Sequence, residues 1–289
     1  MVATHYDADH IAGLIPLVEE YISHIQEVWV HRPPELDDYH NFSLVLRNEQ
    51  ASRILNERLA LVEKEILKDF TEKLDERFPY VFESIRQLKT FLGYLPEEKV
   101  REVFSGYSPK NWPEIKVLGP TKNFYDELFP EDKRFEELIF EELESYEKYA
   151  IQQESIRQIN LKEPHKKPCQ YLKDDKSAKI TPTNKASIIF ALDCAEKRLL
   201  FTGDAGIKSF KTIPNWKREL RNLFWLKIPH HGSDNNMSKE LIDLMSPEYA
   251  DSTGSHHQDE PVLQCISQNP RAKRQARSTK YGGNLVFNF

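Results

Sequence analysis

The chain has 289 residues, of which 39% are hydrophobic and 30% are charged, a balance typical of globular proteins with a full hydrophobic core. No apolar run approaches the roughly 18–20 residues that a membrane span needs, and no signal peptide is evident, so we expect a cytoplasmic protein without membrane contact. The net charge of −6 argues against a protein that coats nucleic acid over its whole surface. Three scattered cysteines (Cys169, Cys194 and Cys265) predict neither a disulfide framework nor a thiolate zinc site.

The first part of the chain, residues 1–45, has the pattern of alternating strands and helices. We expect a strand that ends at residues 2–4, then a polar loop, a helix over 11–25 and a short strand over 28–30. Residues 46–180 are richer in charge. Their apolar residues recur at steps of three and four, which predicts a mostly helical segment. One strand is predicted within it, over 115–118.

From residue 181 the pattern returns to strands and helices. The predicted strands cover 187–192, 198–201, 224–228 and 285–287, and a turn at 194–197 joins the first two. Two α/β pieces, 1–45 and 181–289, thus flank a different kind of segment. This organisation predicts one core domain that carries a mostly helical insertion over 46–180.

The polar loop near the start of the chain carries two histidines and two carboxylates in six positions: His5, Asp7, Asp9 and His10. So many histidines and carboxylates within six positions indicate that these side chains are ligands for a pair of divalent metals. The alternative is a solvated loop in which Asp9 caps a helix.

Two later segments also deliver an acidic or histidine side chain directly after a predicted strand. Asp204 follows the strand over 198–201, and the pair His230–His231 follows the strand over 224–228. Three separate segments with this property rarely occur by chance, which favours one shared metal site.

Together, and in this order, the motifs resemble those of the metallo-β-lactamase superfamily, and more narrowly the hydrolase domain of ComEC-type DNA-uptake proteins. The resemblance is carried by His5-x-Asp7-x-Asp9-His10, Asn184-x-x-Ser187, Gly203-Asp204-Ala205 and the run from Leu226 to Ser233. It implies an α/β fold, the αββα sandwich of that superfamily. Family domains begin with strands ahead of the first motif, so we expect an N-terminally abbreviated sandwich with a mostly helical insertion.

The resemblance also implies two divalent metal ions, Zn²⁺ or Mn²⁺, as cofactors. The implied metal ligands are His5, Asp7, Asp9, His10, Asp204 and His231. His5 and Asp7 would belong to one ion, Asp9 and His10 to the other, and Asp204 would bridge both. His231 best matches the last ligand, and His230 is the alternative ligand or a neighbour that faces the substrate. Asp9, Asp204 and His230 are the residues that we expect to act in catalysis.

Asn184 lies near the position at which many members of the superfamily place one more histidine. The first metal site is therefore expected to be poor in ligands. Relatives also carry a histidine directly before a proline near the end of the domain, whereas this chain has Glu260-Pro261 with His256 and His257 displaced upstream. One of these two histidines is a candidate proton donor or outer ligand, and two exposed loop histidines are the alternative.

The function implied is hydrolysis of a phosphodiester, in DNA or RNA, by a metal-bound hydroxide. Two alternatives stay open. The first alternative is a hydrolase of a small ester, thioester or lactone. The second is a non-catalytic module whose helical insertion binds a protein partner.

A basic stretch near the end of the chain bears on the choice between these functions. Its members are Arg271, Lys273, Arg274, Arg277 and Lys280. A stretch of this kind favours contact with a phosphate backbone, and a solvated surface is the alternative. The candidate substrate contacts are Ser233, His257 and Arg274.

Overall fold

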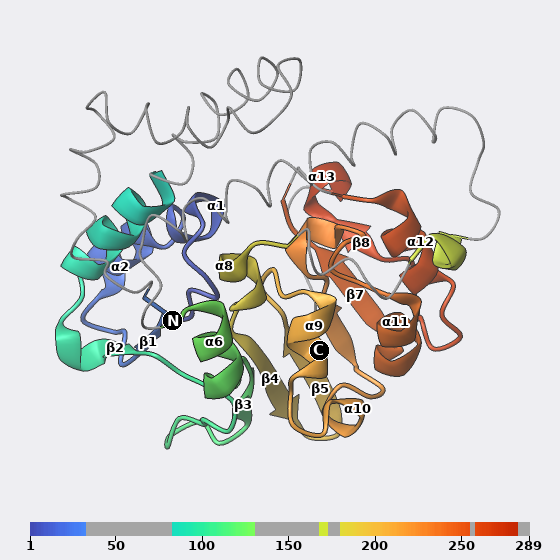
Figure 1. Cartoon of the computed structure of the whole chain (residues 1–289), viewed down its shortest axis with the longest axis horizontal. Coiled ribbons are helices and arrows are strands. Elements are labelled where there is room, and N and C mark those ends of the chain that lie inside the picture. Colours follow the sequence, from blue (N-terminus) through green and yellow to red (C-terminus); the bar gives the residue numbers. More distant parts are fainter. Residues whose placement is uncertain (33–82, 131–167, 173–179, 255–257, 283–289) are drawn as a thin grey trace, which may run out of the picture.

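The structure, a computed structural model, describes residues 1–32, 83–130, 168–172, 180–254 and 258–282 (Figure 1). The fold is mixed α/β. The two-stranded sheet consists of β1 (Val28–Trp29) and β2 (Val100–Arg101), which run parallel, and Val2 adds a parallel bridge to Trp29. The six-stranded sheet has the order β3 (Ile115–Gly119), β4 (Ile189–Cys194), β5 (Lys197–Phe201), β6 (Trp225–Lys227), β7 (Tyr249–Ser252) and β8 (Arg277–Ser278).

The six-stranded sheet is antiparallel from β3 to β5 and parallel from β5 to β8. The α-helices are α1 (Ala8–Ile11), α2 (Ile15–Tyr21), α6 (Lys122–Leu128), α8 (Pro182–Lys185), α9 (Ile207–Lys211), α10 (Trp216–Glu219), α11 (Lys239–Met245), α12 (Glu260–Ser267) and α13 (Thr279–Gly282), and residues 83–93 are also helical. Short 3₁₀ turns are η2 (Glu97–Lys99), η3 (Pro168–Tyr171) and η5 (His230–Gly232).

The two sheets and their helices form successive layers. Because side chains alternate along a strand, Val28 and Val30 pack on one face of the small sheet and Trp29 on the other. Val28 and Val30 join a cluster with α1, α2 and the helical residues 83–93, while Trp29 meets Val117 of the large sheet and Ile188, directly before β4. The other face of the large sheet packs against α9, α11 and α12. Figure 1 shows the small sheet with α2 on one side of the molecule and the large sheet with α9 to α12 on the other.

Five predicted strands are found close to their expected positions. They are β1, β3, β4 with β5, and β6, and the expected turn between β4 and β5 is a two-residue turn at 195–196. The helix predicted over 11–25 is wrong in extent. The chain forms α1 and α2 instead, and Pro16 near the start of α2 explains the break, since a proline in a helix interior removes a hydrogen bond and clashes with the preceding turn.

Part of the predicted insertion belongs to the sheets. Both β2 and β3 come from within residues 46–180, and they pair with β1 and β4. Residues 180–184, at the predicted end of the insertion, are buried and include the start of α8. The strand predicted over 285–287 and the helical pattern of residues 46–82 and 131–167 lie outside the described residues.

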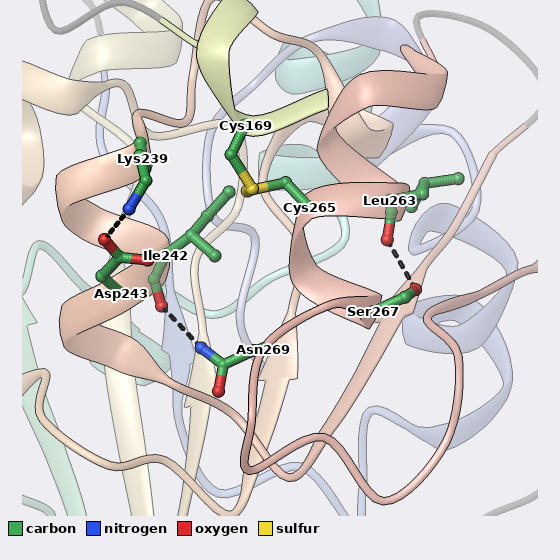
Figure 2. Close-up of a disulfide and its surroundings, with 8 residues drawn as sticks. All are labelled: Cys169, Lys239, Ile242, Asp243, Leu263, Cys265, Ser267 and Asn269. Carbon is green, nitrogen blue, oxygen red and sulfur yellow. Dashed lines mark hydrogen bonds and ion pairs between the residues drawn. A yellow bond between two sulfur atoms is a disulfide. The ribbon is translucent and has the colours of Figure 1, made fainter. Parts of the chain in front are cut away.

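The prediction that the cysteines form no disulfide is wrong. Cys169 of η3 and Cys265 of α12 are bonded, at a separation of 96 residues, and Figure 2 shows the bond between these two elements. Cys265 is buried in the core beside α11, whereas Cys194 is free and exposed. The spacing in the sequence carries no signal of this pair, because the bond depends on η3 packing against α12.

Within the described part of the chain, no helix combines the length and the apolar character that crossing a bilayer requires.

Candidate metal centre

Segments that are distant in the sequence meet at one edge of the six-stranded sheet. Because β5, β6 and β7 are parallel neighbours, their carboxyl ends lie at the same edge. Asp204 follows β5, and His230 and His231 follow β6. The first motif joins them because the backbone amide of Ile188, directly before β4, donates a hydrogen bond to the carbonyl of Thr4 at 2.8 Å.

Two groups of side chains at this edge could each hold a metal ion. One consists of His5, His10 and Asp204, and the other of Asp9, His10 and His231. Within each group the ligand atoms lie within 4.8 Å of one another. His10 belongs to both groups, so the two candidate positions are adjacent. The sequence predicted that these residues share one site, and the structure brings them together.

Asp204 lies at the middle of the centre and points its two carboxylate oxygens in different directions. Its Oδ1 is 3.4 Å from Nε2 of His10 and 3.7 Å from Nζ of Lys227. Its Oδ2 is 3.8 Å from Nε2 of His5 and 3.7 Å from Nε2 of His230. A carboxylate with one oxygen on each side is the arrangement that a bridging ligand requires.

His5 is held from behind by hydroxyl groups. Its Nδ1 lies 3.1 Å from Oγ1 of Thr4 and 3.3 Å from Oγ of Ser187, and that serine also accepts a hydrogen bond from the amide of Asp204 at 3.0 Å. Gly203 permits this close packing. It has φ +53°, and a Cβ there would lie 2.8 Å from the Cβ of Thr4. The contacts at Nδ1 leave Nε2 of His5 facing the centre.

His231 is fixed in the same manner from the other side of the centre. Its Nδ1 donates a hydrogen bond to the carbonyl of Thr253 at 2.6 Å, and its Nε2 is 3.2 Å from Oδ2 of Asp9. A partner of this kind sets the tautomer of a ligating histidine. His230 and His231 both have positive φ, 45° and 53°, a conformation that costs about 1–3 kcal/mol per residue and is frequent at functional sites.

His230 and Asp204 share one support, the side chain of Asn236. The Oδ1 of Asn236 lies 2.9 Å from Nδ1 of His230, and its Nδ2 donates to the carbonyls of Asp204 at 2.8 Å and Ala205 at 3.2 Å. Asn236 is fully buried. One amide thus links the loop after β5 to the loop after β6.

Burial sets the protonation of the first group. Burial and the neighbouring His10 lower the pKa of His5 to about 3, so His5 is neutral at pH 7, the form that binds metals. The pKa of Asp204 lies well below its usual range. Burial alone would raise it, but His10 and His230, together with His5, outweigh that effect. Asp204 is therefore ionised.

Burial also lowers the pKa of His230 and that of Lys227. The pKa of His231 is raised, because the hydrogen bond to Asp9 and the charge of Asp204 outweigh the effect of burial. A raised pKa means that His231 holds a proton more readily, so protons would compete with a metal ion for this imidazole at acidic pH.

The residues present fit a pair of divalent ions. Nε2 of His5, Nε2 of His10 and Oδ1 of Asp204 are buried without a hydrogen-bond partner among the described residues, which is costly unless another group satisfies them. Two ligand atoms bound tetrahedrally at about 2.0–2.2 Å to one ion lie roughly 3.3–3.6 Å apart. The distances from Asp204 to His10, His230 and His5, 3.4 Å, 3.7 Å and 3.8 Å, lie within or slightly above this range.

The remaining predicted site residues do not belong to the two three-ligand groups. Asp7 is buried beside His5, with Oδ2 3.7 Å from Nε2, but it belongs to neither compact group. Ser233 is fully buried, and its Oγ accepts a hydrogen bond from the amide of Asn235, so it supports the loop from within. His257, like His256, lies outside the described residues.

The basic stretch is largely engaged in ion pairs. Arg274 and Arg277 both bind the buried carboxylate of Asp251, and Arg271 pairs with Glu248. These guanidinium groups are held against β7 and the residue before it. Contact of Arg274 with a substrate stays a prediction.

Sequence reasoning missed two residues at the centre. Lys227 carries a weak signal, since it is a lysine between Leu226 and Ile228 in a buried strand, where an unpaired charge is rare. Asn236 carries none, because its contacts depend on how the loop after η5 folds back over Asp204.

No family model matches the chain, and no curated protein matches it. The assignment of function therefore depends on the residues and their geometry.

Proposed function

We propose that this protein is a dinuclear metal-dependent hydrolase of the metallo-β-lactamase superfamily. The observation that carries the proposal is the meeting of two three-ligand groups that share His10, the first of which contains Asp204. The order of layers, from helices through the small and large sheets to further helices, supports the αββα arrangement expected for that superfamily. The position of the centre at the carboxyl ends of parallel strands supports it as well.

Each ligand has a distinct part in this proposal. His5, Asp7 and Oδ2 of Asp204 would hold one ion, and Asp9, His10, His231 and Oδ1 of Asp204 the other. When bound, two such ions lower the pKa of a coordinated water and neutralise charge on the substrate oxygen. Thr253 and Ser187 keep the imidazoles of His231 and His5 aimed at the centre. Asp9, whose side chain is 46% exposed, lies where a substrate could approach.

A phosphodiester is the substrate class that we favour. The centre combines up to four positive charges from the metals and one from Lys227 with three carboxylates, so it would carry net positive charge and favour an anionic substrate. DNA or RNA is the proposed source of that phosphodiester.

Metal analysis paired with a hydrolysis assay tests the proposal. Wild-type protein is purified, loaded with Zn²⁺ or Mn²⁺, and assayed on single- and double-stranded DNA, RNA and bis(p-nitrophenyl) phosphate. Asp204→Ala is expected to lose both bound metal and hydrolysis. Asp243→Ala, which removes an exposed aspartate of α11, is the matched control and should behave like the wild type. A wild type that binds no divalent metal would overturn the proposal.

A second candidate, a hydrolase of a small ester, thioester or lactone, is favoured by one observation. The ion pairs of Arg271, Arg274 and Arg277 withdraw three guanidinium groups from contact with a phosphate backbone. The same assay with p-nitrophenyl acetate and an aliphatic lactone distinguishes the two. Metal-dependent hydrolysis of these substrates without cleavage of any phosphodiester would favour the second candidate.

A further inference from the structure

His230 and His231 are adjacent in the sequence. The simplest expectation is that only one of them binds a metal ion and that the other is a neighbour of the site. The structure instead separates them. Nε2 of His231 faces Asp9, at 3.2 Å, whereas Nε2 of His230 faces Oδ2 of Asp204, at 3.7 Å. That oxygen is also the one nearest to Nε2 of His5, at 3.8 Å. The two imidazoles thus face different carboxylates of the candidate centre.

The hydrogen bonds of Asn236 determine which nitrogen of His230 carries the proton. Both hydrogens of its Nδ2 are used by the carbonyls of Asp204 and Ala205, so its Oδ1 is the atom that faces His230. An amide oxygen only accepts hydrogen bonds. Nδ1 of His230, 2.9 Å away, must therefore be the donor, and in the neutral ring Nε2 then presents a lone pair to the centre.

We propose that both histidines are metal ligands. His230 binds the ion held by His5 and Oδ2 of Asp204, and His231 binds the ion held by Asp9 and His10. Asn236 is a positioning residue that keeps His230 in the ligating tautomer. This inference rests on the proposed dinuclear centre and supplies the ligand that its first site lacks.

The left-handed conformation of both residues agrees with this assignment. Two successive residues with φ 45° and 53° turn the chain sharply after Pro229, and each then presents Nε2 to a different acceptor group. Each imidazole also has its own partner at Nδ1, Asn236 for His230 and the Thr253 carbonyl for His231. A histidine that served only to pack would need neither the strained backbone nor a fixed tautomer.

Titration with Co²⁺ and Zn²⁺ alone tests the assignment, with stoichiometry from calorimetry and coordination from the Co²⁺ absorption spectrum. The wild type should bind two ions. His230→Ala and His231→Ala should each lose tight binding of one ion, with different residual Co²⁺ spectra, because different sites remain. His24→Ala, which removes an exposed histidine away from the centre, is the control and should bind two ions.

Asn236 variants test the positioning role. Asn236→Leu removes the acceptor for Nδ1 and should weaken the His230 site about 10- to 100-fold, while the other site keeps its affinity. Asn236→Asp keeps an acceptor and should retain more of that affinity. Circular dichroism of each variant shows whether the fold is kept, and the two substitutions give independent results if His230→Ala fails to fold.

The inference would be overturned if His230→Ala bound two ions with wild-type affinity. This holds even if the variant lost hydrolysis, because His230 would then act only on the substrate. Equal affinities in Asn236→Leu and the wild type would overturn the role of Asn236. The proposed function fails separately. It fails when the wild type hydrolyses none of the substrates tested, whatever the metal titrations give, and a wild type that binds no ion overturns both.

Discussion

Gly254 is the residue at which a single added methyl group should disrupt the centre. It follows β7 with φ +89°, and a Cβ there would lie 2.3 Å from Nδ1 and 2.8 Å from Cε1 of His231. An ordinary contact begins at 3.4 Å, so in Gly254→Ala the imidazole has to move by about 1 Å. It is not free to do so, since Nδ1 is bonded to Thr253 and Nε2 faces Asp9.

The expected effect of Gly254→Ala has two parts. The left-handed backbone costs alanine about 1–2 kcal/mol, and the lost hydrogen bond to Thr253 costs about 1 kcal/mol more, which together lower the free energy of unfolding by about 2–3 kcal/mol. The displaced ligand should weaken binding of the ion at Asp9, His10 and His231 by about 10- to 100-fold. Chemical denaturation measures the first effect and Co²⁺ titration the second.

Gly93→Ala is the matched control. Nothing lies within 4 Å of a Cβ at this position, so stability and metal affinity should be unchanged or slightly higher. A Gly254→Ala protein with the metal affinity of the wild type would refute the reasoning, because His231 would then tolerate a displacement that the geometry forbids for a ligand.

Three further predictions concern the surroundings of the centre. Lys227→Met should raise the affinity for divalent metal beside Asp204 about tenfold or more in calorimetry, since it removes a buried positive charge, and an unchanged affinity would contradict this. Asp251→Asn should lower the free energy of unfolding by about 2 kcal/mol at pH 7. The pKa of Asp251 is lowered to about 2, because hydrogen bonds from Arg277, Arg274 and Trp225 outweigh the effect of burial, so this stabilisation exists above the unfolded pKa near 4 and disappears as the pH falls towards 2. Cys265→Ser, which opens a loop of 96 residues, should lower the free energy of unfolding by about 2–5 kcal/mol in urea denaturation, and equal stability would show that the bond adds nothing.

Several elements of the fold followed from the sequence alone. Strands β3 to β6 were predicted because runs of apolar residues of strand length are bounded by turn signals, and such runs have few other ways to bury themselves. The strands β7 and β8 were not, since Tyr249–Ser252 and Arg277–Ser278 are short and contain charged residues that pair with each other across the strands. The helix over 11–25 failed at Pro16, a local signal that was present in the sequence.

The sequence by itself determined which side chains could form a metal centre: His5, Asp7, Asp9, His10, Asp204 and the pair after β6. Ligand types at strand ends are a local property, and local properties can be read along the chain. Only the tertiary structure decided that His230 faces Asp204 whereas His231 faces Asp9, that Lys227 and Asn236 belong to the same centre, and that Cys169 meets Cys265. These relations depend on how loops from parallel strands pack at one sheet edge, and no spacing in the sequence records that packing.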